Sequence, residues 1–255
     1  VKGTLTALLD DIPTPDLEKR RAARANVEAI IAEGLSKHRT ATHDLTSANL
    51  RPLRPERMMA IIDGLLPSDA IVAADASSST QWVLNYMTAR RPGQRFLSPR
   101  GLAGLGWGYP MALGAKLARP DAPVVCVVGD GGFAHNWSEM ETAVRMKLPV
   151  IIIVLNNGIL GYQVYGELTK FHQFTDACEL APVDHAKIAT ACGYDSVVVD
   201  NAEDFAMALE TALNSGRPML IDAICDPAAY PPVTALDPVE TMVDKVPVPM
   251  KQRGV

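Results

Sequence analysis

Two polar residues, Asp130 and Asn157, stand just after apolar runs that read as buried β-strands, at residues 124–128 and 150–155. Both runs are short and rich in β-branched residues, which is typical of strands covered on both faces of a parallel sheet. Apolar residues at helical spacing lie between the runs, so the segment predicts one β-α-β unit with a right-handed crossover. Because ligands bind such sheets at the carboxyl ends of the strands, we expect Asp130 and Asn157 to share one binding edge.

The residue types at this edge indicate a site for a hard cation and a phosphate. A carboxylate, an amide oxygen and the peptide carbonyls freed where a strand ends suit Mg²⁺ or Ca²⁺ and would hold zinc or copper poorly. Backbone N–H groups can approach phosphates closely through the glycines of the turn, Gly129, Gly131 and Gly132. A tight turn beside a surface carboxylate is the alternative for Gly-Asp-Gly alone, but its pairing with Asn-Asn after the next strand favours the metal site.

Gly-Asp-Gly followed at this distance by Asn-Asn resembles the cofactor motif of thiamine-diphosphate enzymes. Residues 68–232 resemble the cofactor-binding domain of the acetolactate (acetohydroxyacid) synthase group within that family. The resemblance implies thiamine diphosphate and Mg²⁺ as cofactors, and a metal that clamps the diphosphate. Its ligands would be the side chains of Asp130 and Asn157 and the backbone carbonyl of Ile159, with Leu160 as a neighbouring cofactor contact.

The resemblance assigns further cofactor contacts to two segments. Ser78 and Ser79 fall on positions that hold the diphosphate, where the synthases more often carry Gln and His; helix capping is the alternative for these hydroxyls. In residues 101–108, Leu105 would be the wedge that bends the cofactor into a V, while its N–H and the Ala103 carbonyl would hydrogen-bond the pyrimidine. Many relatives carry Gly and Met at these two positions. The glycine spacing here, G-x-x-G-x-G, departs from a dinucleotide fingerprint.

The stretch after Asn157, up to residue 182, lacks periodicity and adjoins the predicted site, so we expect an irregular lid there. Tyr162, Gln163 and Tyr165 are candidates for substrate contacts, with half-buried packing on a short helix as the alternative for the tyrosines. Acetohydroxyacid synthases typically place a Trp here that shapes the substrate pocket, and Gly166 takes that position. This departure bears on the substrate rather than on the cofactor.

Alternating strands and helices predict an α/β fold, with a doubly wound, mostly parallel sheet and helices on both faces. We expect residues 1–45 to be a helical remnant of a preceding domain plus a linker, residues 46–232 to be the thiamine-diphosphate-binding domain, and residues 233–255 to be a Pro-rich tail. Helices are expected over residues 1–12, 16–35, 54–66, 110–117, 184–191 and 203–213, and further strands over residues 69–75, 196–199 and 219–224. A polar connector is expected over residues 36–54, because Gly34 and a basic cluster end the helix before it.

Composition is that of an ordinary soluble globular protein: 255 residues, 48% hydrophobic and 21% charged. The net charge of −5 gives no reason to expect nucleic acid or an anionic membrane as a partner. No apolar run reaches transmembrane length and no signal peptide is apparent, so we expect a cytoplasmic protein. The cysteines show no CxxC pairing, and Cys126 and Cys225 are expected in buried strands.

The resemblance implies a transferase or lyase that decarboxylates a 2-oxo acid and performs carboligation. Catalysis in this family needs a Glu from a separate domain of a neighbouring subunit, and the residues before Ser68 are too few and too helical to build that domain. We therefore expect this chain alone to be inactive, a second polypeptide or domain to supply the Glu, and a higher oligomer (a tetramer or a dimer of heterodimers). Another thiamine-dependent 2-oxo acid decarboxylase, a non-catalytic partner subunit of the same fold and a dinucleotide-binding oxidoreductase are the alternatives.

Overall fold

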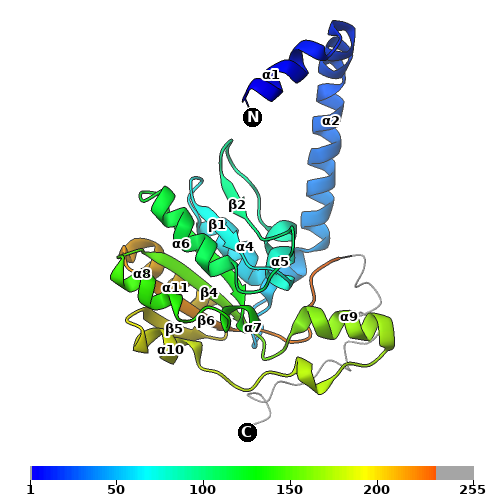
Figure 1. The fold of residues 1–255 in the computed structure, drawn as a ribbon. Helices are drawn as coiled ribbons and strands as arrows, with labels where there is room; N and C mark the ends of the chain where they lie inside the picture. Colours follow the sequence, from blue (N-terminus) through cyan, green and yellow to red (C-terminus); the bar gives the residue numbers. More distant parts are fainter. Residues whose placement is uncertain (1, 234–255) are drawn as a thin grey trace. The chain divides into compact units, whose positions relative to one another are not determined.

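The computed structural model describes residues 2–233. The chain divides into two compact units, of which the first ends at Asp44 and the second begins at Leu45. In the first unit α1 (Lys2–Asp11) is followed by α2 (Thr14–Ala41), and α3 (His43–Ser47) crosses the boundary (Figure 1). None of these helices has a buried residue in the described structure. The predicted tail lies outside the described residues from position 234 onward.

Helix α2 is longer than predicted, and the polar connector predicted from residue 36 onward is wrong over its first part. The helix passes through Gly34 and ends at Ala41, where the backbone N–H of Thr42 donates to the His38 carbonyl. A glycine inside a helix costs about 1 kcal/mol relative to alanine, which surrounding helix formers can offset. Lys37 also pairs with Glu33 at 2.6 Å, an i, i+4 contact that spans the glycine.

The second unit is built on one sheet of six strands, all parallel, in the order β2-β1-β3-β4-β6-β5. The strands are β1 (Ile71–Ala74), β2 (Arg95–Leu97), β3 (Val124–Gly129), β4 (Val150–Asn156), β5 (Asp195–Val199) and β6 (Met219–Ile224). The predicted α/β class and parallel sheet are confirmed. Strand β2 was not predicted, because three residues at a sheet edge, none of them fully buried, give no apolar run.

Helices cover both faces of the sheet, as predicted. They are α4 (Pro55–Leu65), α5 (Ser78–Tyr86), α6 (Gly108–Ala118), α7 (Asp130–Phe133), α8 (Glu139–Arg145), α10 (His185–Ala191) and α11 (Ala202–Ser215), whereas the buried face of α9 (Gly161–Phe171) belongs to a separate cluster. Alternate residues of β3 enter two separate cores: Val125 and Val127 pack with α4, α5 and α11, whereas Cys126 and Val128 pack with α6, α8 and α10. Such a strand must be apolar at every position, which explains the continuous hydrophobic run.

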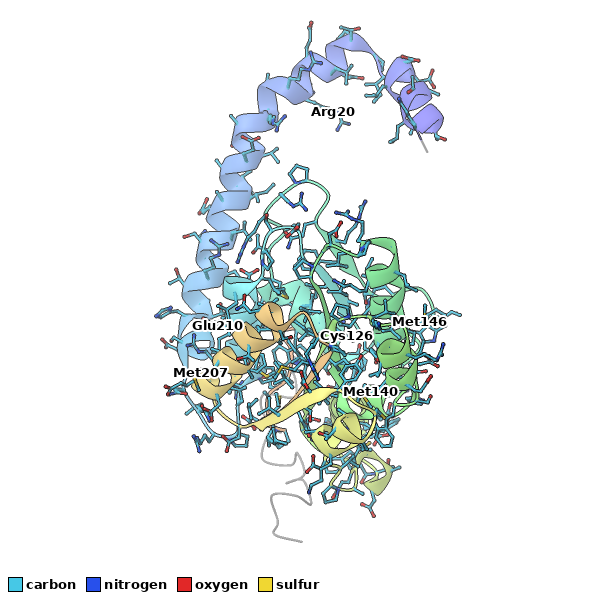
Figure 2. The ribbon with its side chains drawn as sticks, turned by 90° about the vertical axis from the view of Figure 1, so that its left-hand side faces the viewer. Arg20, Cys126, Met140, Met146, Met207 and Glu210 are labelled. Carbon is cyan, nitrogen blue, oxygen red and sulfur yellow. The ribbon has the colours of Figure 1, made fainter. Side chains whose placement is uncertain are left out.

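Figure 2 shows side chains of the interior and of the surface on the same ribbon. Cys126 and Met140 are fully buried, whereas Met146 and Met207 are about half exposed. Cys225 is also buried, as predicted. No helix within residues 2–233 is both long and apolar enough to cross a bilayer.

The strand order creates a switch point between β1 and β3. From β1 the chain moves to its neighbour β2 on one side, then crosses back to β3 on the other side. Loops on the two sides of a switch point diverge and leave a crevice at the carboxyl ends of the strands. Those ends carry Asp75 after β1, Asp130 after β3 and Asn157 after β4.

Candidate functional site

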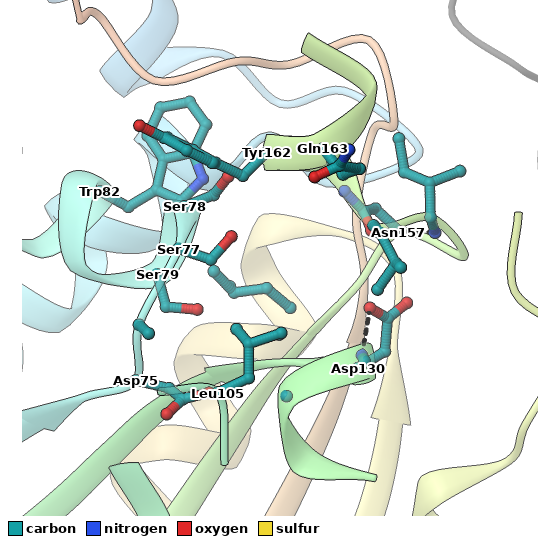
Figure 3. Close-up of a pocket in the computed structure, with 18 of the residues that line it drawn as sticks. Asp75, Ser77, Ser78, Ser79, Trp82, Leu105, Asp130, Asn157, Tyr162 and Gln163 are labelled. Carbon is teal, nitrogen blue, oxygen red and sulfur yellow. Dashed lines mark hydrogen bonds between the residues drawn. The ribbon is translucent and has the colours of Figure 1, made fainter. Parts of the chain in front are cut away.

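A pocket of about 480 Å³ opens at this switch point (Figure 3). Its walls come from the segments that follow β1, β3 and β4, and from the loop before α6. The residues that line it include Ser77, Ser78, Ser79, Trp82, Arg100, Ala103, Leu105, Gly129, Asp130, Gly131, Gly132, Asn157, Ile159, Leu160, Tyr162 and Gln163. Every residue predicted from the sequence to contact cofactor, metal or substrate therefore lines one cavity, although their roles as ligands stay predictions.

Asp130 begins α7 directly after β3, and its carboxylate is buried. Its Oδ1 accepts the backbone N–H of Gly131 at 2.8 Å, and its Oδ2 accepts the N–H of Gly158 at 2.7 Å. Burial raises the pKa of this carboxyl group to about 7, even though the two N–H donors lower it. A cation at this position would offset the cost of burial and hold the group in its charged form.

Asn157 and Ile159 extend this wall from the end of β4. The amide oxygen of Asn157 accepts the N–H of Ile159 at 3.3 Å, which folds the chain back beside the strand end. Asp130 and Asn157 lie on the same side of the pocket (Figure 3). One carboxylate, one amide and nearby peptide carbonyls form a set of oxygen ligands suited to Mg²⁺. Residues 2–233 hold no cluster of three or more His, Cys, Asp or Glu side chains that could bind a metal ion.

A buried network that the sequence did not reveal fixes the end of β4. The amide of Asn156 donates to Oδ1 of Asp222 at 2.8 Å, and Oδ2 of Asp222 accepts the backbone N–H of His185 at 3.1 Å. His185 itself packs edge-on against two aromatic rings, those of Phe133 and Trp137. Asn156 thus ties the end of β4 to Asp222 in β6, while the next residue, Asn157, lines the pocket.

The glycines of the turn after β3 are not equivalent. A Cβ on Gly131 would approach Cδ2 of Leu160 to 2.6 Å, and a Cβ on Gly132 would clash with the Asp75 carboxylate. A Cβ on Gly129 would meet only Ser79 Oγ, at an ordinary 3.8 Å. Close packing of the turn against neighbouring side chains therefore explains two of the three glycines.

The opposite wall is the serine turn between β1 and α5. Ser77 holds a left-handed backbone (φ 71°), a conformation that costs a non-glycine residue free energy and is concentrated at functional sites. The N-terminus of α5 has no side-chain cap, so the capping alternative for the hydroxyls is not observed there. The Oγ atom of Ser78 is buried and makes no hydrogen bond with the described residues. An unpaired hydroxyl beside the pocket fits the predicted diphosphate contact.

Between the two walls, Leu105 points into the pocket (Figure 3). It is 40% exposed and lines the cavity, so it presents apolar surface to a ligand there. Ala103 has φ 54°, in the region that glycine prefers, which accounts for the Gly that many relatives carry there. The backbone thus keeps its glycine-like conformation despite the substitution.

The predicted irregular stretch is wrong over residues 161–171, which form helix α9, while its role as a lid stays a prediction. Val164, Tyr165 and Leu168 make its buried face, a pattern that two glycines, Gly161 and Gly166, obscured in the sequence. Tyr162 and Gln163 begin the helix and line the pocket, as expected of substrate contacts. Tyr165 also lines the pocket, but it is buried, and its hydroxyl donates to the carbonyls of Pro227 and Ala229, at 2.9 and 2.6 Å.

Sequence reasoning missed one carboxylate of the site, Asp75. It is fully buried, and its oxygens accept the backbone N–H groups of Gly106 at 3.0 Å and Gly108 at 2.8 Å. Its position at the end of a predicted strand, like that of Asp130, was the signal available. Asp130 was recognised because its Gly-Asp-Gly turn is paired with Asn-Asn, but Asp75 belongs to no such pair. Its place at a strand end alone did not distinguish it from a surface carboxylate.

Comparison with known proteins matches this site to one family. Residues 75–223 match the model of the thiamine pyrophosphate (thiamine diphosphate) enzyme C-terminal TPP binding domain. A probable acetolactate synthase large subunit from Methanococcus aeolicus is 33% identical over 185 residues, covering 70% of this chain and 31% of the relative. A benzoylformate decarboxylase from Pseudomonas aeruginosa is 33% identical over 176 residues, covering 67% and 32%.

A solved structure gives the same assignment. The thiamine diphosphate-dependent 4-hydroxybenzoylformate decarboxylase of Rhodococcus jostii RHA1 superposes with a TM-score of 0.62 at 30% identity, over 70% of this chain and 34% of that one. The chain thus spans about a third of the length of these relatives. It belongs to the thiamine pyrophosphate enzymes, and it contains the C-terminal cofactor-binding domain of their acetolactate-synthase-like group.

Proposed function

We propose that this chain binds thiamine diphosphate through one Mg²⁺ ion, as part of an acetolactate-synthase-like enzyme that decarboxylates 2-oxo acids and performs carboligation. The observation that carries the proposal is the composition of one pocket. It places the buried carboxylate of Asp130 and the amide of Asn157 on one wall, the unpaired hydroxyl of Ser78 on another, and Leu105 between them.

The metal would be held by Asp130, Asn157 and the carbonyl of Ile159. Asp130 is the only charged member of this set, so it supplies the electrostatic part of the affinity. Its hydrogen bonds from Gly131 and Gly158 fix the carboxylate before the metal arrives, which lowers the cost of ordering it. The hydroxyl of Ser78 would then satisfy its hydrogen bond on a diphosphate oxygen.

Thiamine diphosphate supplies, when bound, the electron sink that decarboxylation and carboligation need. The chain's own contribution is to orient it and to exclude water. Leu105 provides an apolar support between the ring positions, and Ala103 offers a backbone carbonyl beside it. These contacts shape the bound cofactor and do not take part in bond making.

Arg100 is the one lysine or arginine that lines the pocket within residues 2–233. Its guanidinium makes no hydrogen bond or ion pair with described residues, so it is free to meet the carboxylate of a 2-oxo acid. Tyr162 and Gln163, at the start of α9, would contact the rest of the substrate. Gly166 adds no side chain to this wall, and a Cβ there would meet nothing within 4 Å.

A second polypeptide or domain is required to complete the site. No glutamate is among the described residues that line the pocket, whereas the family draws its activating Glu from a separate domain. The loop before α6, beside the pocket, also exposes apolar side chains that a partner could bury: Leu102 is 92% exposed and Trp107 is 53% exposed. We propose that the active form is a higher oligomer in which this loop meets the Glu-bearing part.

Two relatives support a decarboxylase as the second candidate for the reaction. Benzoylformate decarboxylase matches this chain at the same identity as the acetolactate synthase, and the solved relative acts on a hydroxylated benzoylformate by its name. Assays of CO₂ release by the complete enzyme, with the Glu-bearing part present, should therefore offer both pyruvate and benzoylformate. Consumption of one and not of the other decides between the candidates.

The test of cofactor binding uses the purified chain and Asp130→Ala. Thiamine diphosphate should bind the parent only when Mg²⁺ is present, and the variant should keep its circular dichroism spectrum but lose this binding. Asp184→Asn is the matched control, because Asp184 caps α10 away from the pocket and Asn caps equally well. Equal cofactor affinity of Asp130→Ala and the parent would refute the metal assignment.

The test of the missing Glu measures CO₂ release by the chain without a partner. With thiamine diphosphate and Mg²⁺ supplied, no turnover is expected. A rate on the order of 1–1,000 per second, which is ordinary for enzymes, would show that the chain is complete.

A further inference from the structure

Asp75 lies directly after β1, outside the Gly-Asp-Gly and Asn-Asn motif, and is fully buried. Both of its oxygens are engaged by backbone: Oδ2 accepts the N–H of Gly106 at 3.0 Å and Oδ1 accepts the N–H of Gly108 at 2.8 Å. Hydrogen bonds to an ionised acceptor are about twice as strong as those between neutral groups. A single carboxylate therefore holds the loop before α6 at two points, Gly106 and Gly108, and we call this pair of hydrogen bonds the clamp.

The clamp acts on the residues that follow Leu105. Gly106 has φ 83° and Ala103 has φ 54°, so the backbone on both sides of Leu105 holds left-handed conformations. Glycine adopts this conformation freely, but in Ala103 it persists only where the surroundings enforce it. From the other side, the amide of Asn136 donates to the Gly106 carbonyl at 2.5 Å. Asp75 and Asn136 together set the direction in which Leu105 points.

The same carboxylate packs against the turn after β3. A Cβ on Gly132 would clash with Oδ2 of Asp75, and a Cβ on Gly108 would come within 2.8 Å of the Asp75 backbone. Asp75 also continues through Ala76 into the serine turn that carries Ser78. Three segments of the pocket wall thus meet at one buried side chain.

We propose that Asp75 is a positioning residue for the cofactor rings. It sets where Leu105 and the Ala103 carbonyl meet the rings, without touching metal or diphosphate, since both of its oxygens are occupied by the loop. This inference rests on the proposed function, because it needs thiamine diphosphate as the ligand. It separates the pocket into a part that binds diphosphate, around Asp130, and a part that binds rings, held by Asp75.

The test compares two ligands that share the diphosphate but differ in the rings: thiamine diphosphate and inorganic pyrophosphate, each with Mg²⁺. In Asp75→Asn the side chain keeps its volume against Gly132, but an NH₂ group now faces one of the two N–H donors. One half of the clamp is lost and the turn after β3 is undisturbed. Thiamine diphosphate affinity should fall roughly tenfold, the loss that 1.4 kcal/mol produces, while pyrophosphate affinity should change by less than about twofold.

Asn136→Ala provides an independent variant, which decides the matter if Asp75→Asn fails to fold. It releases the same loop from the other side and should give the same selective loss for thiamine diphosphate. Amide exchange at Gly106 and Gly108 should accelerate in both variants. Leu209→Ala, on the buried face of α11, is the control for general destabilisation. It should leave the ratio of the two affinities unchanged.

The outcomes are distinct. Unchanged binding of both ligands in the loop variants would overturn the positioning role. An equal loss of both ligands would also overturn it, because Asp75 would then support the whole pocket. If the parent binds neither ligand, the proposed function fails and this inference falls with it.

Discussion

Oδ2 of Asp130 accepts the backbone N–H of Gly158 at 2.7 Å, which joins the end of β3 to the residue after Asn157. The two strands lie side by side, with Gly129 opposite Leu155, so this bond closes the ladder at its carboxyl end. Both halves of the sequence motif are therefore held together without any ligand. A site ordered in this way would bind the proposed metal at a lower entropic cost.

The raised pKa of Asp130 predicts how metal binding depends on pH. Burial lifts this pKa to about 7, whereas the carboxyl group of an unfolded chain titrates near 4, so the folded protein holds the proton more tightly. The metal-free protein should lose stability between about pH 4 and pH 7, as the unfolded chain ionises first. Because Mg²⁺ binds the ionised form, its apparent affinity should rise about tenfold per pH unit up to about pH 7 and then level off.

Calorimetric titration of Mg²⁺ in the presence of thiamine diphosphate, between pH 5.5 and pH 8, measures this dependence. Asp130→Asn removes the titrating group and should abolish the slope along with most of the affinity. A flat profile for the parent would mean that Asp130 is not the ligand whose proton the metal displaces.

The second prediction concerns the wedge. Leu105→Ala should leave the affinity for inorganic pyrophosphate with Mg²⁺ nearly unchanged, because Leu105 lies between the walls and does not belong to the oxygen set. In the complete enzyme it should lower kcat by about 100-fold, the cost of a small misplacement of reacting groups. Steady-state kinetics beside pyrophosphate titration measures both quantities, and an equal loss of pyrophosphate affinity and rate would mark Leu105 as ordinary packing.

The sequence predicted residues that line the pocket, Leu105 and Ala103 included, but not the carboxylate that holds their loop, for a physical reason. Asp130 and Asn157 end long buried strands, and such strands are visible as continuous apolar runs. Asp75 bonds to backbone groups 31 and 33 positions away, and a side chain that meets backbone leaves no pattern in its partners. The clamp could therefore be found only in three dimensions.

Local exceptions explain the other errors. Gly34 was read as the end of its helix and the segment around Gly166 as irregular, yet α2 and α9 continue through these glycines. In α9 the burial of Tyr165 and Leu168 outweighs the low propensity of glycine. Helix propensity alone decides where a helix ends only where side-chain packing contributes little.

The third prediction compares two glycines of one turn. Gly132→Ala must displace the Asp75 carboxylate, which its two N–H donors hold in place, so the free energy of unfolding should fall by about 1–3 kcal/mol. Gly129→Ala meets only ordinary contacts and has a φ of −77°, so the change should stay within about 0.5 kcal/mol. Urea unfolding of both variants tests the difference. Equal stability would show that the turn after β3 is not packed against Asp75 as described.

The central claim is that Asp130, Asn157 and Ile159 hold one metal that binds the diphosphate. The most direct measurement is a crystal structure of the chain grown with thiamine diphosphate and Mg²⁺. We predict a single ion coordinated at about 2.0–2.1 Å by the two side chains and the Ile159 carbonyl, with the rings resting on Leu105 and a diphosphate oxygen within hydrogen-bonding distance of Ser78. A metal bound without Asp130, or a cofactor seated away from Leu105, would contradict the assignment.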